Sequence, residues 1–300
     1  MQKVSIVTDG SSDLPKDLVE KYNIHIAPFQ VIFGEEAFQM MGNYGDLTPD
    51  DFYAKLASTK EFPTTAIPSP KSFLTAYEKA LKDAESVIAI YISKELSGAY
   101  QSGLNMVSSF EGEDITIVNS KVAASTLGAL VIEAAKMAKN GSSKKEILNR
   151  LDELIPKAQL VTVQDNIDAV YRSGRVGWIK KFLVSTFKIK PILHFSEEGK
   201  LVPGGILRGR EEADNAMREA AKHVIKNTVT DTLFIWHVRY EKFANELKTI
   251  MEKDNPNNVD IVVIEAGPVV GVHVGPDSLA FMYIGDYKPE WLLGEDKKKK

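Results

Sequence analysis

The sequence predicts an α/β fold of two domains, the first built on a parallel sheet and the second on a mixed or antiparallel sheet. Apolar strand-like runs alternate with helical segments up to about Lys157, which is the pattern of a parallel sheet. Beyond that point two strand candidates are joined by SEEGK, residues 196–200, which is typical of a hairpin turn. We therefore expect an α/β domain at 1–157, a second domain at 158–290, and a charged, disordered tail at 291–300.

The expected elements of the first domain follow one another without a long linker. A strand at 4–9 leads to a helix from about Ser12, with Pro15 in its first turn and Ser12 or Asp13 as its N-cap. The other elements are strands at 24–33, 87–92 and 115–120 and helices at 48–59, 69–83, from Ala99, at 123–139 and at 143–158. The loops after the strands should then share one edge of the sheet, where α/β proteins bind ligands.

The second domain is expected to be strongly apolar. Its predicted strands lie at 160–163, 188–195, 201–208, 232–238, 259–266 and 279–286, and its helices at 167–187, 211–227 and 241–254. These segments carry more apolar surface than a site for a polar ligand requires. The pattern therefore favours an apolar ligand.

Composition excludes several classes of function. The chain has 300 residues, 44% of them hydrophobic, which is enough to bury two cores. A net charge of -4 argues against a nucleic-acid partner, because nucleic-acid-binding domains are usually basic. The absence of cysteine excludes disulfides and thiolate chemistry, and five scattered histidines form no metal motif, so no metal or cofactor is expected. No stretch resembles a signal peptide or could span a membrane, so we expect a cytoplasmic protein.

The segment from Ser86 to Phe110 gives the strongest indication of a binding site. An apolar strand runs into a Ser/Gly loop and then directly into a helix that begins near Ala99. The loop offers the hydroxyls of Ser93 and Ser97, and Gly98 allows a ligand to approach the backbone. Because the first N–H groups of a helix lack intrahelical partners, this geometry predicts a receptor for a carboxylate or phosphate. The alternative is that Ser97 only caps the helix.

Two other polar loops are candidates for the same edge of the sheet. In TDGSSD, four polar side chains could bind a cation or a substrate: Asp9, Ser11, Ser12 and Asp13. Alternatively, the loop could simply cap the next helix. In PTTAIPSP the prolines enforce an extended backbone, in which Ser69 is expected to cap a helix and Thr65 is the candidate ligand contact.

Basic residues and one histidine stand out in the second domain. Arg172, Arg175, Lys180 and Lys181 surround two glycines, and Arg208 and Arg210 flank a third. A solvated basic face is the simpler interpretation, but Gly174 breaks a helix at a cost of about 0.5–1 kcal/mol relative to alanine. His273 lies between two Gly/Pro turns, which hold it at a bend.

Eight motifs, in order along nearly the whole chain, resemble the DegV family, the fatty-acid-binding subunits of bacterial fatty acid kinases. They are TDGSSDLP, PTTAIPS, ISKELSGAYQS, VNS at 118–120, YRSGRV, KPIL, Arg208 before Gly209, and GPVVGVHVGPDSLA. The resemblance implies a non-catalytic carrier in bacterial phospholipid metabolism. It would bind a long-chain fatty acid and present the carboxylate to a fatty acid kinase, which forms the acyl phosphate.

The resemblance also implies where the ligand lies. The acyl chain would be buried between helices and sheet of the second domain, with its carboxylate at the interface of the domains. The carboxylate contacts would be Thr65, Ser97, Gly98, His273 and Arg175. Arg172, Arg208 and Arg210 are then the candidates for docking the kinase, and a transient contact with a membrane surface is left open.

The chain departs from the family pattern close to the expected headgroup. Ala66 and Ile67 stand where the family has serine and glutamine, and Ala99 replaces a threonine. Asn119 replaces an aspartate, and Asp277 replaces the last glycine of the histidine motif. These changes bear on headgroup contacts and acyl preference more than on the fold.

The rival interpretation is an enzyme, a serine-dependent acyl transferase or hydrolase with Ser97 as nucleophile and His273 as base. It requires the two side chains within hydrogen-bond reach and a carboxylate, such as Asp9 or Asp277, to orient the imidazole. No GxSxG elbow surrounds Ser97, and the chain has no glycine motif for a triphosphate or dinucleotide. A sensor of phosphate or sugar would use the same helix N-terminus but would not explain the apolar second domain.

Overall fold

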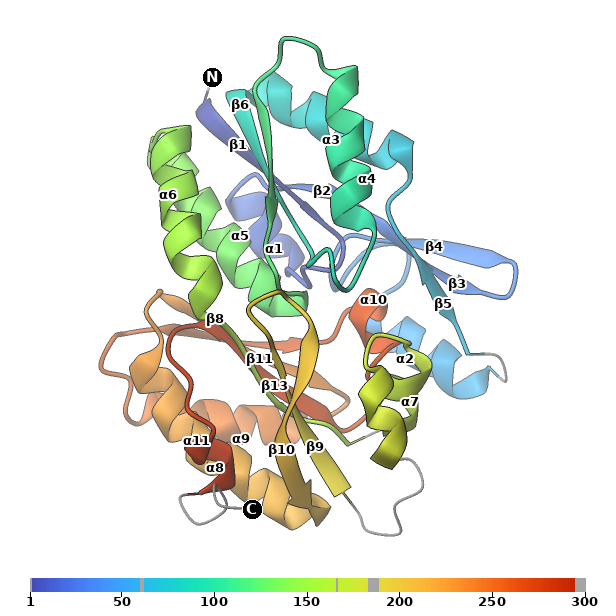
Figure 1. Cartoon of the computed structure of the whole chain (residues 1–300), viewed down its shortest axis with the longest axis vertical. Coiled ribbons are helices and arrows are strands. Elements are labelled where there is room, and N and C mark those ends of the chain that lie inside the picture. Colours follow the sequence, from blue (N-terminus) through green and yellow to red (C-terminus); the bar gives the residue numbers. More distant parts are fainter. Residues whose placement is uncertain (1, 60–61, 166, 183–188, 295–300) are drawn as a thin grey trace. The chain divides into compact units, whose positions relative to one another are not determined.

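The computed structural model describes residues 2–59, 62–165, 167–182 and 189–294 (Figure 1). The chain divides into two compact units. The first contains Met1–Pro156 together with Glu197–Lys200 and Ala266–Val272, and the second contains Lys157–Ser196, Leu201–Glu265 and His273–Lys300. None of the described helices is both long enough and apolar enough to cross a membrane.

The first unit is built on a four-stranded parallel sheet. Its order is β2 (His25–Ala27), β1 (Gln2–Asp9), β6 (Ala84–Tyr91) and β7 (Ile115–Asn119). Helices α3 (Pro70–Asp83) and α4 (Ala99–Met106) lie on one side of this sheet, and α5 (Ala124–Lys139) and α6 (Lys144–Leu154) lie on the other (Figure 1). Strands β1 and β6 are buried along almost their whole length, as a sheet covered on both faces requires.

A second, antiparallel sheet of this unit was not predicted. Its order is β4 (Glu36–Met40), β3 (Phe29–Phe33) and β5 (Thr64–Ala66). The predicted strand at 24–33 is wrong as a single element, because it divides at Pro28 into β2 and β3, which belong to different sheets. Proline has no N–H for a strand ladder, so the break falls there. Helices α2 (Pro49–Ser58) and α10 (Pro268–Gly271) also belong to this unit.

The start of the first helix was predicted wrongly. Helix α1 spans Lys16–Lys21, and the residue before it, Pro15, makes no side-chain cap. Ser12 and Asp13 are fully buried in the preceding turn, and Asp13 has φ +47°, which is not a helical conformation. The predicted cap at Ser69 is confirmed, since its side chain accepts the N–H of Ser72 and α3 begins at the next residue.

The second unit contains a six-stranded mixed sheet. Its order is β10 (Leu201–Arg208), β9 (Ile189–Phe195), β8 (Ala158–Val163), β13 (Ser278–Ile284), β11 (Thr232–Val238) and β12 (Asp260–Glu265). Only the pair β11 and β12 is parallel among these. The α/β fold with a parallel sheet in the first unit and a mixed sheet in the second is confirmed, as is the hairpin between β9 and β10.

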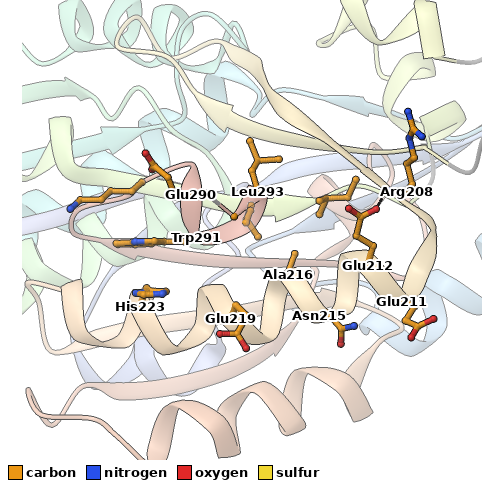
Figure 2. A pocket seen from close by; sticks show the side chains of 14 residues that line it. Arg208, Glu211, Glu212, Asn215, Ala216, Glu219, His223, Glu290, Trp291 and Leu293 are labelled. Carbon is orange, nitrogen blue, oxygen red and sulfur yellow. Dashed lines mark hydrogen bonds between the residues drawn. The ribbon is translucent and has the colours of Figure 1, made fainter. Parts of the chain in front are cut away.

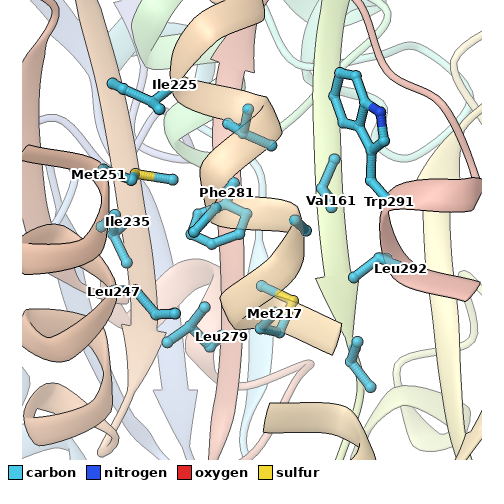
Figure 3. Packing of buried hydrophobic residues seen from close by; sticks show 14 of the residues in the cluster. Val161, Met217, Ile225, Ile235, Leu247, Met251, Leu279, Phe281, Trp291 and Leu292 are labelled. Carbon is cyan, nitrogen blue, oxygen red and sulfur yellow. The ribbon is translucent and has the colours of Figure 1, made fainter. Parts of the chain in front are cut away.

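One face of the mixed sheet carries the main hydrophobic core of the second unit. Helices α8 (Gly209–Asn227) and α9 (Glu241–Glu252) pack on it, together with the short α11 (Glu290–Leu293). Figure 3 shows Met217, Ile225 and Leu247 gathered around Leu279 and Phe281 of β13. Trp291 and Leu292 of α11 also belong to this core, although the sequence assigns them to the tail. Residues 295–300 lie outside the described part of the chain.

The helix expected at 167–187 is shorter than predicted. Helix α7 ends at Arg172, and a 3₁₀ helix follows at Gly177–Phe182. Between them Gly174 has φ +73°, a left-handed conformation that ends a helix and that glycine adopts without steric cost. Val170, Val176 and Ile179 of this segment pack on Leu193 of β9 in a small separate cluster. The predicted residues 183–187 lie outside the described part of the chain.

Candidate carboxylate-binding site

Asp9 organises the carboxyl edge of the parallel sheet. Its side chain is fully buried and accepts hydrogen bonds from the N–H and hydroxyl of Ser11, at 2.9 and 2.5 Å, and from the N–H of Ile92, at 2.9 Å. Burial raises the pKa of Asp9, and these hydrogen bonds oppose the rise. Asp9 thus links the loops after β1 and β6 and does not face a ligand. The described residues hold no cluster of histidine or acidic side chains suited to a metal.

The two serines of the 93–98 loop have different environments. Ser93 is fully buried, donates to the carbonyl of Gly199 at 2.7 Å and accepts the N–H of Glu95 at 3.2 Å. The expectation that Ser93 offers its hydroxyl to a ligand is therefore wrong. Ser97 is half-buried, and its hydroxyl oxygen accepts the N–H of Ala99 at 3.3 Å. Its hydroxyl hydrogen can still be donated to an anion.

Gly98 leaves open space beside Ser97. It occupies the N-cap position of α4 and makes no side-chain cap. The N–H of Ala99 donates to Ser97, and the next N–H groups of the first turn have no intrahelical partner. A Cβ placed on Gly98 would meet one heavy atom within 4 Å, the Cδ1 of Ile67 at 3.9 Å. The predicted anion receptor is thus sterically accessible at this point.

The segment that carries Thr65 lies next to the 93–98 loop. Thr65 is the middle residue of β5, opposite Val31, and is half-buried. Two residues later, the exposed side chain of Ile67 reaches the space above Gly98. The first unit therefore brings together the segments of Thr65, Ser97 and Gly98. At position 67, where the family pattern has glutamine, this chain has isoleucine, which places an apolar group beside Gly98.

Arg175 is folded back onto its own turn in the second unit. Ser173 donates its hydroxyl to the carbonyl of Val170 at 2.6 Å and accepts the N–H of Arg175 at 3.2 Å. The guanidinium then donates to the carbonyl of Ser173 at 2.5 Å. Burial lowers the pKa of Arg175, but a guanidinium stays charged in any protein environment. The break at Gly174 thus presents one fixed positive charge.

His273 lies in the turn after α10, within the electrostatic reach of Arg175. Burial, assisted by the charge of Arg175, lowers the pKa of His273 to about 3. At neutral pH the imidazole is therefore uncharged and carries one N–H donor. The second unit brings Arg175 and His273 together, as a charged donor beside a neutral one.

The arginines predicted to dock a kinase differ in their surroundings. Arg172 is exposed and pairs with Asp168 one helical turn earlier at 2.7 Å. Arg210 is held by Asp165 at 2.5 Å and Asp214 at 3.7 Å, and its guanidinium lies 4.8 Å from the ring centroid of Tyr240. A side chain engaged in this way is a poor docking group. Sequence reasoning missed this cluster because Asp165 and Tyr240 lie far from Arg210 in the chain, although Asp214 is only one helical turn away.

A groove of about 1000 Å³ lies between α8 and α11 in the second unit. Figure 2 shows His223 and Trp291 stacked at one end and Arg208 with Glu212 at the other. Among the predicted site residues, Arg208 alone lines it, next to several glutamates: Glu211, Glu212, Glu219 and Glu290. Arg208 therefore lies in a mixed-charge surrounding, not on a purely basic face.

Comparisons with known proteins agree with these features. The DegV family model, whose description is that of an uncharacterised protein family, matches residues 3–286. A DegV domain-containing protein of Staphylococcus aureus is 30% identical over 285 residues, which cover 94% of this chain and 98% of the relative. Another from Halalkalibacterium halodurans is 31% identical over 288 residues, covering 94% and 99%.

Solved structures show the same fold. A structure described as DegV, a fatty acid binding protein from Bacillus subtilis, is 26% identical with a TM-score of 0.83. A structure described as fatty acid binding of a DegV family protein from Thermus thermophilus is also 26% identical, with a TM-score of 0.82. Each similarity covers 95% of this chain and 100% of the other. The chain therefore belongs to the DegV family.

Proposed function

We propose that this chain binds a long-chain fatty acid and contacts its carboxylate through Thr65, Ser97, Gly98, Arg175 and His273. One observation carries the proposal above all. The DegV proteins of Bacillus subtilis and Thermus thermophilus, described as fatty acid binding, share the fold of this chain at TM-scores of 0.83 and 0.82.

The chemistry of these residues suits a carboxylate. A buried carboxylate is costly unless it is paired and hydrogen-bonded, and hydrogen bonds to charged groups contribute about 1.5–3 kcal/mol each. Arg175 supplies a positive charge, and the Ser97 hydroxyl and the His273 imidazole supply neutral donors. The first N–H groups of α4 add the partial positive charge of a helix N-terminus.

The affinity would come mainly from the acyl chain. Burial of each methylene gains about 0.8 kcal/mol, so roughly fifteen of them supply a gross term of order 12 kcal/mol before the ordering costs of binding. We place the acyl chain of the ligand next to the segment 167–182, because this segment carries Arg175 and packs on β9 through only a small hydrophobic cluster. The core between β13 and helices α8 and α9 is already filled by side chains.

We further propose that the carrier presents the carboxylate to a fatty acid kinase, which phosphorylates it to an acyl phosphate. Arg172 and Arg208 are then the better candidates for docking the kinase, because both are exposed. Arg210 is the weaker candidate, since it is engaged within the second unit.

The alternative is an acyl transferase or hydrolase with Ser97 as nucleophile and His273 as base. Its requirements are met poorly. An imidazole with a pKa of about 3 is a weak general base at neutral pH, because catalytic bases work best with a pKa near the operating pH. Within the described part of the first unit, Ser97 hydrogen-bonds to the N–H of Ala99 and to no histidine or carboxylate.

Denaturing extraction of the purified protein, followed by mass spectrometry, tests the proposal. We expect a long-chain fatty acid near one per chain. No extracted lipid, together with no binding of added oleate or palmitate, would exclude the carrier. A covalent acyl group on Ser97 would favour the enzyme instead.

A further inference from the structure

The turn that carries His273 is held in place at its far end. It runs from His273 to Asp277, ahead of β13, and its backbone has positive φ at Gly275 (+79°) and Asp277 (+59°). The N–H of Asp277 donates to the carbonyl of Val238 at 2.9 Å. The carbonyl of Asp277 accepts a hydrogen bond from the guanidinium of Arg210 at 3.1 Å. Both backbone polar groups of this residue are therefore engaged.

These contacts help to stabilise the backbone conformation of Asp277. A left-handed backbone is costly for residues with a Cβ and persists where the surroundings impose it. The motif of the DegV family has glycine at this position, which adopts positive φ freely. This chain has aspartate instead, which tolerates positive φ better than most residues but less freely than glycine, so the contacts of its backbone outside the turn help to hold the conformation.

Arg210 is itself fixed from three directions. Its guanidinium pairs with Asp165 at 2.5 Å and with Asp214 at 3.7 Å. It also lies 4.8 Å from the ring centroid of Tyr240, whose hydroxyl donates to Asp214 at 2.8 Å. Asp165 in turn pairs with Lys190 of β9. These groups come from β9, α8 and the loops after β8 and β11, so Arg210 ties the 273–277 turn to the frame of the sheet.

We propose that Arg210 is a positioning residue for His273: by holding the carbonyl of Asp277, it fixes the turn that presents the imidazole to the ligand. The inference rests on the proposed function, in which His273 contacts the fatty-acid carboxylate. Arg210 does not touch the ligand in this arrangement. It acts through the backbone of the turn and thereby sets the placement of the imidazole relative to Arg175.

Arg218 provides a matched control. It lies on the same helix, pairs with Glu246 at 2.7 Å, and its guanidinium is 5.0 Å from the ring centroid of Phe243. Arg210 and Arg218 thus share an ion pair and an aromatic contact, but those of Arg218 reach α9. Any general cost of removing an arginine from α8 should appear in both variants.

The experiment compares Arg210→Gln with Arg218→Gln in the full chain. Two quantities are measured: the affinity for oleate and the imidazole NMR signal of His273, assigned with His273→Gln. We expect Arg210→Gln to weaken oleate binding about tenfold, which is 1.4 kcal/mol, and to shift the His273 signal. Arg218→Gln should change neither. Arg210→Lys, which keeps the charge but loses the planar fork, should give an intermediate result.

Equal effects of the two glutamine variants would overturn the inference. So would a loss of affinity in Arg210→Gln with an unmoved His273 signal, because that result indicates direct contact with the ligand. If Arg210→Gln does not fold, Asp165→Asn loosens the same guanidinium and must produce the same pair of changes. A parent protein that binds no fatty acid, but whose His273 signal still moves in Arg210→Gln, would refute the proposed function and not the positioning role.

Discussion

Replacing Ser97 by alanine should weaken fatty-acid binding strongly while leaving the fold nearly intact. The substitution removes one hydroxyl donor to a charged acceptor, worth about 1.5–3 kcal/mol, or roughly a ten- to hundredfold loss of affinity. The same substitution should lower the stability of the fold by less. The hydroxyl accepts only the N–H of Ala99, at 3.3 Å and at the half-buried start of a helix, where losing such a bond costs about 0.5–1 kcal/mol.

Ser93, four residues earlier in the same loop, is the control for this prediction. Its hydroxyl donates to the buried carbonyl of Gly199 at 2.7 Å, so Ser93→Ala leaves that carbonyl without its donor and should destabilise the protein by about 1–3 kcal/mol. Its affinity for fatty acid should stay close to that of the parent. Competition with a fluorescent fatty acid and urea denaturation measure the two quantities. If Ser97→Ala binds like the parent, or if Ser93→Ala loses the same affinity without losing stability, the assignment of the two serines is wrong.

Three other predictions concern the neighbouring groups. Gly98→Ala should fold normally, because its Cβ enters open space, but it should bind fatty acid more weakly, because that space is where the carboxylate is proposed to lie. Gly103→Ala should instead destabilise the protein by about 1–3 kcal/mol, because its Cβ would lie 2.5 Å from the ring of the buried Tyr91. The pKa of His273 is lowered from 6.5 to about 3, so the unfolded chain binds the proton more readily and the protein loses stability as pH falls from 6.5 towards 3. The difference between the free energies of unfolding at pH 7 and pH 4, measured with urea, should be smaller in His273→Gln. Arg208→Gln should leave fatty-acid affinity unchanged and lower turnover by a cognate fatty acid kinase, and a loss of affinity equal to the loss of turnover would contradict a docking role.

The sequence predicted the elements whose local signals agree with their surroundings. Helix α3 begins where Ser69 and Pro70 mark an N-terminus, and β6 is an apolar run that a covered parallel sheet requires. The prediction failed where contacts between residues distant in sequence determine the local conformation. Ser12 has the chemistry of an N-cap, yet it is buried in a turn that the carboxylate of Asp9 organises through Ser11 and Ile92.

The candidate site shows the same limit. Ser93 and Ser97 are equivalent in the sequence, and only the contact of Ser93 with Gly199, more than a hundred residues away, separates a structural hydroxyl from an available one. Arg208 and Arg210 are likewise equivalent in sequence. Asp214 lies one helical turn after Arg210 and is visible in the local sequence, but Asp165 and the ring of Tyr240 come from distant segments, so the local pattern shows only part of the compensation of this charge.

The neutral state of His273 bears on how a carrier could release its ligand. In the proposed site, a charged imidazole would place two cations beside one carboxylate. An acyl phosphate formed there would be held still more tightly, because it carries more negative charge than the carboxylate. Burial, assisted by the charge of Arg175, keeps the proton off His273, so this arrangement does not arise at neutral pH. One fixed cation with neutral donors balances the carboxylate without excess positive charge. If the proposed function is correct, Arg175 and His273 would therefore provide the charge needed for binding and limit the attraction that would trap the product.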